Sequence, residues 1–444
     1  MAKNFPELGV QIPNILLPKK WIDLEKRAVV ACDQYTSEPE YRQEVSNIVN
    51  DEPSTLNITF PEVYLEDEDK PQRIENIQAY MSKYLESGIL EDQGEGLILV
   101  DRKTSHADSR KGLMIALDLE SYDYSKESQT LIRATEGTVI DRLPPRIQIR
   151  KDASIELPHI MVLIDDEKRT VIEPLFAQKD KYEQIYDTDL MMNGGHITGY
   201  KVNDEASINQ VLAALKTLGQ KDVFQNKYNV GDDKWVLLFA MGDGNHSLAT
   251  AKAIWEQKKL TLNDEQRAND PARFALVELV NVHDTGLAFE PIHRVLFNVD
   301  AQHLLEAFKA FADVNIQTFA SMADMKAHTP TSDADHHYIN FVFDTTYGII
   351  TINHPQFNLE VWNLQAFLDN YLKANSDAKI DYVHGEETTE KLWSQAWNMG
   401  FWLPIMNKND FFKTVVIDWV LPRKTFSMWE AEEKRFYLEA RKIK

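Results

Sequence analysis

The chain is organised around the stretch Trp235-Val-Leu-Leu-Phe-Ala-Met-Gly-Asp-Gly-Asn-His-Ser-Leu-Ala-Thr-Ala-Lys-Ala-Ile-Trp255. Its seven leading apolar residues, Trp235 to Met241, suit a buried strand and are too few to span a membrane. Two glycines then bracket Asp243, and a helical pattern runs from about Asn245 to Lys259. The pattern predicts a strand, a tight turn and a helix.

A turn of this kind favours an anion, because it directs free backbone N–H groups at whatever lies above it. Asp243 could simply cap the helix, and His246 could be an ordinary core residue. Capping alone explains neither the two flanking glycines nor the histidine. We therefore interpret Asp243 and His246 as functional residues.

Composition excludes several classes of protein. With 43% hydrophobic and 27% charged residues in 444, the chain is globular. Its net charge of −22 argues against nucleic-acid binding. Cys32 is the single cysteine, which excludes an intramolecular disulfide and a cysteine-based zinc site. No stretch resembles a signal peptide or a membrane span, so we expect a cytoplasmic protein without a membrane or nucleic-acid partner.

The middle of the chain is rich in predicted strands. Residues 96–102 and 111–119 suggest a hairpin. A cluster of arginines follows near a Gly-Thr turn that also carries Glu136 and Thr138; it comprises Arg133, Arg142, Arg146 and Arg150. These arginines either pair with nearby carboxylates or converge on an anionic ligand.

Helices and strands alternate irregularly along the remainder. Residues 274–282 suit a strand, 338–343 and 347–352 a hairpin, 415–420 a closing strand, and the basic tail from Glu430 a helix. The overall pattern predicts an α+β fold, with mixed sheets, hairpins and flanking helices. We place a soft boundary between an α+β core at 1–262, which holds the strand-turn-helix motif, and a C-terminal α+β region at 263–444.

Three familiar motifs do not fit this turn. A dinucleotide fingerprint would need a third glycine where Ser247 stands, and no Gly-x4-Gly-Lys-Ser/Thr phosphate loop occurs. The Gly-Asp and Gly-Asn-His phrases of binuclear metallophosphatases are compressed into five residues here and cannot surround two metals. No His-Glu-x-x-His helix is present, so we expect no dedicated metal site.

The phrase Asp243-Gly-Asn-His-Ser-Leu-Ala-Thr-Ala251 resembles the Asp-Gly-His-His-Arg-x-x-x-Ala hallmark of the bacterial and archaeal family called domain of unknown function ten-fifteen. Further phrases resemble that family in the right order: Glu136-Gly-Thr138 with Asp141-Arg142, Asp284-Thr-Gly-Leu287, Pro291-Ile-His-Arg294 and Leu421-Pro-Arg-Lys-Thr-Phe-Ser-Met428. The resemblance therefore spans nearly the whole chain.

This resemblance implies a ParB/sulfiredoxin-like core, enlarged here by the C-terminal region. The superfamily includes kinases that phosphorylate free serine with ATP or ADP, in which the phrase opens a helix beneath the nucleotide phosphates. The present sequence departs from the hallmark at two positions, where Asn245 replaces a histidine and Ser247 replaces an arginine. The second change removes a phosphate-binding charge, which Arg133, Arg142 or Arg146 could supply.

The resulting hypothesis is a kinase, dependent on ATP or ADP with Mg²⁺, that acts on the hydroxyl of free serine or a similar amino acid. The candidate catalytic residues are Asp243, His246 and Glu136. The candidate cofactor-binding residues are Gly242, Gly244, Asn245, Ser247, Arg133, Thr138, Arg142 and Arg146. The candidate substrate-binding residues are Asp33, Gln34 and Tyr35. A non-catalytic nucleotide- or metabolite-binding regulator is the alternative, and a hydrolase of small phosphate esters is a third possibility.

Overall fold

The computed structural model describes residues 3–444 apart from 126, 139, 386–388, 390, 391, 394 and 423. Arg423 of the closing family phrase thus lies outside the described residues. The chain forms two compact units, one of Met1–Leu287 with Trp429–Lys444 and one of Ala288–Met428. The boundary expected between residues 262 and 263 lies inside the first unit.

The first unit contains a mixed sheet of 11 strands within the described residues, and its main path runs β12-β13-β6-β7-β15-β11-β14-β9-β8. Pairing is parallel between β11 and β15, β14 and β9, and β8 and β9, and antiparallel elsewhere along this path. The strands of the unit are β1 (Asn4–Phe5), β2 (Val10–Gln11), β3 (Asn14–Pro18), β4 (Val29–Val30), β5 (Leu90–Glu95), β6 (Leu97–Lys103), β7 (Arg110–Asp118), β8 (Tyr122–Asp123), β9 (Ile132–Arg133), β10 (Ile155–Glu156), β11 (Met161–Ile164), β12 (Glu183–Leu190), β13 (Gly195–Val202), β14 (Phe239–Asp243), β15 (Phe274–Asn281), β23 (Phe436–Tyr437) and β24 (Arg441–Lys442).

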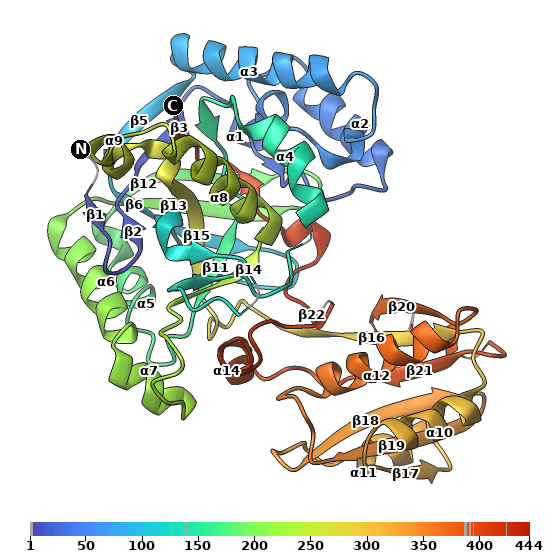
Figure 1. Ribbon diagram of the computed structural model, residues 1–444. Coiled ribbons are helices and arrows are strands. Elements are labelled where there is room, and N and C mark those ends of the chain that lie inside the picture. Colours follow the sequence, from blue (N-terminus) through green and yellow to red (C-terminus); the bar gives the residue numbers. More distant parts are fainter. Residues whose placement is uncertain are drawn as a thin grey trace. The chain divides into compact units, whose positions relative to one another are not determined.

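Helices surround this sheet (Figure 1). They are α1 (Leu24–Arg27), α2 (Pro39–Val49), α3 (Lys70–Glu86), α4 (Leu143–Arg150), α5 (Glu173–Phe176), α6 (Glu205–Leu218), α7 (Lys221–Tyr228), α8 (Asn245–Lys259) and α9 (Asp264–Asn269). The predicted α+β class with mixed sheets, hairpins and flanking helices is confirmed.

Both faces of the sheet are buried. Along β6, Leu97 and Leu99 join an apolar cluster that contains Trp255 of α8. The alternate residues Ile98 and Val100 join a second cluster on the opposite face, because side chains of a strand alternate between its two sides. The central strands are accordingly apolar throughout, as sheets covered on both faces require.

The predicted strand, turn and helix at the centre of the chain are present. The strand β14 begins at Phe239, later than the expected Trp235, whose side chain is 65% exposed. The helix α8 begins at Asn245 as predicted and follows Gly244, whose φ of +82° lies in the left-handed region that favours glycine. A Cβ atom at Gly244 would also lie 3.1 Å from the Cα of Ile160.

The C-terminal tail is not helical, so that prediction was wrong. Instead, β23 pairs with β4 and β24 pairs with β10. The charges that suggested a solvated helix are buried in ion pairs, since Arg435 contacts Glu278 and Glu439 while Arg441 contacts Glu156. Residues 415–420, expected as a closing strand, begin within the last turns of a helix, α14 (Lys408–Asp418).

The second unit has a seven-stranded sheet within its described residues, in the order β17-β19-β18-β21-β16-β20, with β22 paired to β16. Its strands are β16 (Glu290–Phe297), β17 (Val314–Phe319), β18 (His336–Phe343), β19 (Thr346–Asn353), β20 (Lys379–His384), β21 (Met399–Trp402) and β22 (Phe426–Ser427). Its helices are α10 (Ala301–Phe311), α11 (Met322–His328), α12 (Glu360–Ala374) and α14. The β18–β19 hairpin confirms the predicted one.

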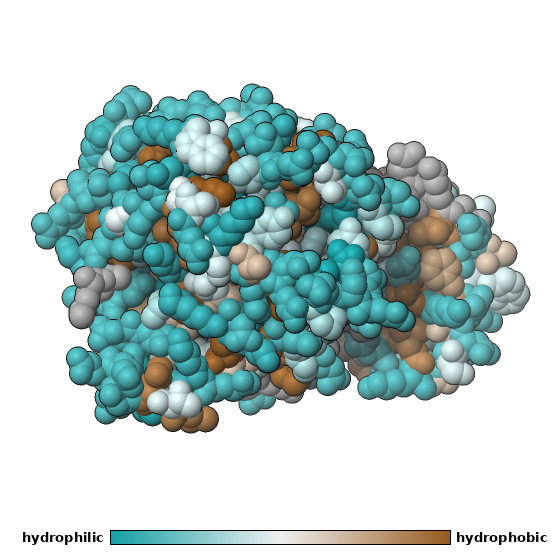
Figure 2. Space-filling view, turned by 90° about the horizontal axis from the view of Figure 1, so that it is seen from above, coloured by the Kyte–Doolittle hydropathy of each residue, from teal (hydrophilic) through white to brown (hydrophobic). Residues whose placement is uncertain are grey.

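The molecular face shown in Figure 2 is dominated by hydrophilic residues, with apolar residues scattered among them. This distribution agrees with the high content of acidic side chains. In the described part of the chain, no helix combines the length and apolarity that crossing a bilayer requires.

Candidate functional site

The first turn of α8 presents backbone N–H groups without a side-chain cap. The N-cap residue, Gly244, has no side chain to offer, and its own N–H donates to Oδ1 of Asp243 at 2.8 Å. Asp243 therefore does not cap the helix in the ordinary way, which needs an acceptor for the N–H of the second or third helical residue. The N-terminus of α8 keeps its attraction for an anion.

Lys434 supplies a cation at this turn. Its Nζ donates to Oδ2 of Asp243 at 2.8 Å, although the two residues lie 191 positions apart in the sequence. Burial disfavours the charge of Lys434, but the carboxylates of Asp243 and Asp33 raise its pKa above the ordinary value. Sequence reasoning missed this residue because the tail that carries it was expected to be a helix.

Ser247 is positioned by a chain of hydrogen bonds. Its Oγ lies 2.8 Å from Nε2 of His159, whose Nδ1 lies 2.8 Å from the Tyr437 hydroxyl. That hydroxyl oxygen accepts the backbone N–H of Cys32 at 3.1 Å. Burial raises the pKa of Tyr437 well above its ordinary value, so the phenol keeps its proton.

Tyr437, His159 and Ser247 form one continuous chain of hydrogen bonds, in which the Tyr437 oxygen accepts from Cys32. The ring nitrogens of His159 can each donate or accept, and the tautomer decides which. The chain fixes the position of the Ser247 hydroxyl at the first turn of α8. Sequence reasoning missed His159 and Tyr437.

The four clustered arginines do not converge on one point. Arg133 donates to the backbone carbonyls of residues 130, 235 and 236 and is buried, so it holds two chain segments together. Arg146 pairs with Glu62, and Arg150 pairs with Glu156. Arg142 is exposed. Two of the four arginines, Arg146 and Arg150, therefore pair with carboxylates, which was one of the two interpretations of the cluster.

Two of these arginines nevertheless act on His246. Burial lowers the pKa of the half-buried His246, and Arg146 and Arg142 lower it further, whereas Asp33 raises it. The histidine is consequently neutral at pH 7. Arg142 and Arg146 therefore contribute positive potential beside the first turn of α8, where His246 is the second residue.

The loop that precedes α4 is hydrogen-bonded to α8 and β14. The N–H of Thr135 donates to Oδ1 of Asn245, and its hydroxyl donates to the carbonyl of Met241. Glu136 is exposed on this loop. Thr138 has a buried hydroxyl oxygen without a hydrogen-bond partner within the described residues. The predicted Glu136 and Thr138 thus lie on this loop, and the predicted Asn245 lies on α8 and accepts one of the hydrogen bonds that hold the loop.

Of the predicted substrate residues, Asp33 lies near Lys434, whereas Tyr35 packs elsewhere. Burial opposes ionisation of Asp33, but His159, Gln34 and Lys434 together hold its pKa below the ordinary value. Gln34 donates to Oδ1 of Asp33. Tyr35 has a φ of +55° and stacks on Tyr41 with 3.6 Å between ring centroids. Asp33 is therefore an ionised group within electrostatic reach of Lys434, and Tyr35 packs against α2.

A cavity of about 130 Å³ adjoins the first turn of α8. Polar groups contribute to its lining, among them Ser247, His159, Glu62 and Arg146, and apolar residues such as Ile58 and Met81 complete it. A Cβ atom at Gly242 would lie 3.1 Å from Cγ of Leu163 and 3.2 Å from the Met161 carbonyl oxygen, so Gly242 allows β14 and β11 to lie close.

The described residues at this turn offer few ligands to a metal ion. Across the described residues, no three Asp, Glu, His or Cys side chains form a metal-binding group. A nucleotide-bound Mg²⁺ draws most of its ligands from water and phosphate and needs only one or two carboxylates. Asp243 and Asp33 are carboxylates of this kind, and both lie near Lys434.

The fold is α+β, and the first turn of α8 brings together uncapped N–H groups, the Ser247 hydroxyl and Lys434. The chain belongs to the family described as protein of unknown function (DUF1015), whose model matches residues 16–371. This match confirms the family predicted from the ordered phrases of the sequence.

Several solved structures are similar to the chain. A conserved hypothetical protein from Pyrococcus furiosus has 11% identity and a TM-score of 0.33, covering 73% of this chain and 90% of that one. A free serine kinase mutant in complex with AMP has 10% identity and a TM-score of 0.37, covering 76% and 94%. SbnI with C-terminal truncation, from Staphylococcus aureus, has 10% identity and a TM-score of 0.33, covering 71% and 82%. Comparison with curated proteins gave no match.

Proposed function

We propose that the chain is a nucleotide-dependent kinase that phosphorylates the hydroxyl of free serine or a similar amino acid. The observation that carries this proposal is the first turn of α8, where uncapped N–H groups, the Ser247 hydroxyl and Lys434 surround one turn. Such a set suits phosphate oxygens, since fixed donors and a cation stabilise the charge on a transferring phosphoryl group. ATP or ADP is the proposed donor, and the cytoplasm is the proposed location.

In the proposed complex, backbone N–H groups from Asn245 onwards donate to phosphate oxygens. Ser247 adds its hydroxyl, and neutral His246 adds a ring N–H. Lys434 supplies the charge that the family hallmark places on its arginine, together with the potential of Arg142 and Arg146. Bound Mg²⁺ would neutralise phosphate charge, held by whichever of Asp243 and Glu136 does not receive the substrate proton.

The reaction needs a carboxylate to receive a proton. The substrate hydroxyl oxygen forms a bond to the terminal phosphorus, and the bond between that phosphorus and the nucleotide oxygen breaks. The hydroxyl proton passes to Asp243, whose Oδ2 lies 2.8 Å from Nζ of Lys434. Asp33 binds the ammonium group of the amino acid, and Gln34 holds the Asp33 carboxylate in place. Exposed Glu136 remains a candidate for the same proton.

The test is to incubate the full chain with Mg²⁺, serine and either ATP or ADP, and to detect phosphoserine by mass spectrometry. We expect product with one nucleotide and its loss in the Asp243→Asn variant. Asp233→Asn, at an exposed position in the same unit, is the matched control and should keep full activity.

Two other outcomes would replace this proposal. Nucleotide binding without phosphoserine, tested across other hydroxyl amino acids, would identify the non-catalytic regulator. That alternative has one observation in its favour, because both oxygens of Asp243 already accept hydrogen bonds. Release of phosphate from small esters without any acceptor would identify the hydrolase.

A further inference from the structure

The second unit contains a large cavity of its own. It has a volume of about 1080 Å³, and the described residues that line it lie between 290 and 418. Its walls come from β16, β18, the loops on either side of β18 and β19, and the first turns of α12 and α14. Small-molecule sites usually occupy roughly 300–1,000 Å³, so the cavity can hold an organic ligand.

The lining carries an excess of negative charge. Among the described residues, five carboxylates line the cavity against two lysines, Lys326 and Lys413; the carboxylates are Glu290, Asp333, Glu360, Asp410 and Asp418. Some of these have local partners, as Asp418 accepts the N–H of Asn358 and Asp333 accepts the N–H of His336.

Glu360 and Asp410 differ from the other carboxylates. Each lies in the first turn of a helix, α12 and α14 respectively, and neither side chain has a hydrogen bond or ion pair to any described residue. A helix N-terminus stabilises a nearby carboxylate, which could by itself explain both positions. Burial and the neighbouring Glu360 nevertheless raise the pKa of Asp410 above its ordinary value, against the effects of Lys413 and His337. The two carboxylates therefore repel each other at a half-buried place.

A buried histidine faces the same cavity with one fixed proton. His337 is 4% exposed and lies in the lining, and its Nδ1 is 3.0 Å from Nδ2 of Asn363. The amide of Asn363 can have only this orientation, since its oxygen accepts the N–H groups of Gln356 and Phe357 while its nitrogen donates to the carbonyls of Phe357 and Leu359. The amide shares its two protons among these carbonyls and Nδ1 of His337, and because an amide nitrogen accepts no hydrogen bond, Nδ1 is the acceptor in this contact.

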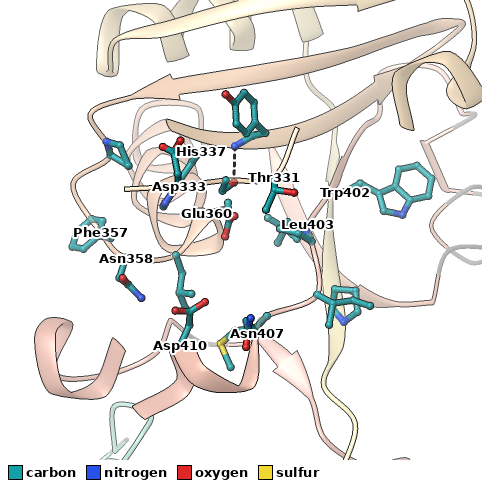
Figure 3. A pocket seen from close by; sticks show the side chains of 18 of the residues that line it. Thr331, Asp333, His337, Phe357, Asn358, Glu360, Trp402, Leu403, Asn407 and Asp410 are labelled. Carbon is teal, nitrogen blue, oxygen red and sulfur yellow. Dashed lines mark hydrogen bonds between the residues drawn. The ribbon is translucent and has the colours of Figure 1, made fainter. Parts of the chain in front are cut away.

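The proton of neutral His337 consequently sits on Nε2. Burial lowers the pKa of this histidine, so the neutral form prevails at pH 7. No side chain in the described part of the chain receives the Nε2 proton. Figure 3 shows His337, Glu360 and Asp410 reaching the cavity from three different elements. The Nε2 N–H of His337 is thus a donor at the cavity without a side-chain acceptor. This observation is independent of the two carboxylates and also points to a ligand.

We propose that this cavity binds a small organic cation. The ammonium group of the ligand lies between Glu360 and Asp410, and an acceptor atom of the ligand receives the Nε2 proton of His337. The apolar part packs against Phe357, Leu403 and Trp402, which line the cavity. A bare metal ion fits less well, since no set of three ligating side chains exists among the described residues. The proposal concerns a different unit from the proposed kinase site and does not depend on it.

The test uses the full chain and two probes of nearly equal shape, tryptamine and its neutral analogue tryptophol. Isothermal titration calorimetry should show tryptamine binding at least about tenfold more tightly, which corresponds to about 1.4 kcal/mol for the charge. Glu360→Gln and Asp410→Asn should each weaken tryptamine binding by about tenfold or more and leave tryptophol unaffected. Asp377→Asn, at an exposed position of the same unit, should bind tryptamine like the unaltered chain.

A second readout separates binding from folding. Because Glu360 and Asp410 repel each other without a ligand, Glu360→Gln should leave the melting temperature of the free protein unchanged or raised, and should abolish its increase on addition of tryptamine. The proposal is overturned if neither probe binds, if both bind equally, or if Asp377→Asn weakens binding as much as Glu360→Gln. A lowered melting temperature with unchanged tryptamine affinity would assign Glu360 a structural role instead.

Discussion

Ser247 lies in the first turn of α8, where a hydrogen bond to His159 holds it, and His159 in turn contacts Tyr437. A hydroxyl carries no charge, but Lys434 brings a cation to the same turn from another part of the chain. In the proposed site, the hydroxyl and the lysine would contact phosphate together.

Replacing Ser247 by alanine should therefore weaken nucleotide binding. The loss of a hydrogen bond to a charged phosphate corresponds to about 1.5–3 kcal/mol, or about a tenfold to hundredfold increase in Kd. Titration calorimetry with ATP and ADP measures the change. Ser87→Ala, at an exposed helix end, is the control. Equal affinity in the Ser247→Ala variant would mean that phosphates do not contact this hydroxyl.

His246 provides a second test at the residue scale. Its pKa should lie below the ordinary 6.5, because burial and the two arginines disfavour the charged ring. Arg146→Gln should raise this pKa towards 6.5, and NMR titration of the ring protons measures both values. Since the folded-state pKa is depressed, the unfolded chain binds more protons, and stability is lost as the pH falls from 6.5 towards the folded-state pKa. A pKa above 6.5 in the unaltered protein would contradict the described surroundings.

At the scale of elements, the join between β14 and α8 depends on Gly244. Gly244→Ala combines a left-handed backbone with a contact of 3.1 Å to the backbone of Ile160. We expect a loss of about 1–3 kcal/mol in the free energy of unfolding, measured by urea denaturation. Gly137→Ala is the matched control, because a Cβ there meets no atom within 4 Å. Equal effects of the two substitutions would argue against this role of Gly244.

Some elements were predictable from sequence because their signals are local. The apolar run before Gly242 and the helical pattern after Gly244 predicted β14 and α8 to within a few residues. The tail was not predictable in this way. Its alternating charges resemble a solvated helix, and only partners more than a hundred positions away, such as Glu156 and Glu278, make those charges tolerable inside the fold.

The same distinction applies to the site. Asp243, His246 and Ser247 could be recognised because one short phrase holds them together. Lys434, His159 and Tyr437 could not, since each reaches the turn through tertiary pairing of strands. Arg133 was misleading for a related reason, because its guanidinium faces backbone carbonyls that lie near it only after folding.

At the scale of the whole molecule, the last 16 residues complete the first unit. A chain ending at Met428 leaves Glu278 buried without Arg435, and it leaves Glu156 with Arg150 but without Arg441. Removing one partner of a buried ion pair costs about 3–5 kcal/mol, which is a large part of the stability of a domain. We expect this truncated chain to lose cooperative thermal unfolding of the first unit.

Hydrogen exchange monitored by mass spectrometry can follow β6, β7 and β15 in the truncated chain and show whether protection disappears there. A chain that lacks only Lys444, whose side chain is exposed, should retain full protection. Unchanged protection in the chain ending at Met428 would show that the tail is dispensable for the first unit.

The pairing of Lys434 with Asp243 also has a consequence for timing. Proteins are made from the N-terminus onwards, at about 5–20 residues per second. Asp243 is therefore synthesised 191 residues before its partner Lys434, and α8 is complete well before that lysine is added. During this interval the turn before α8 exists without its cation, and Asp243 has no lysine to pair with until synthesis has passed residue 434.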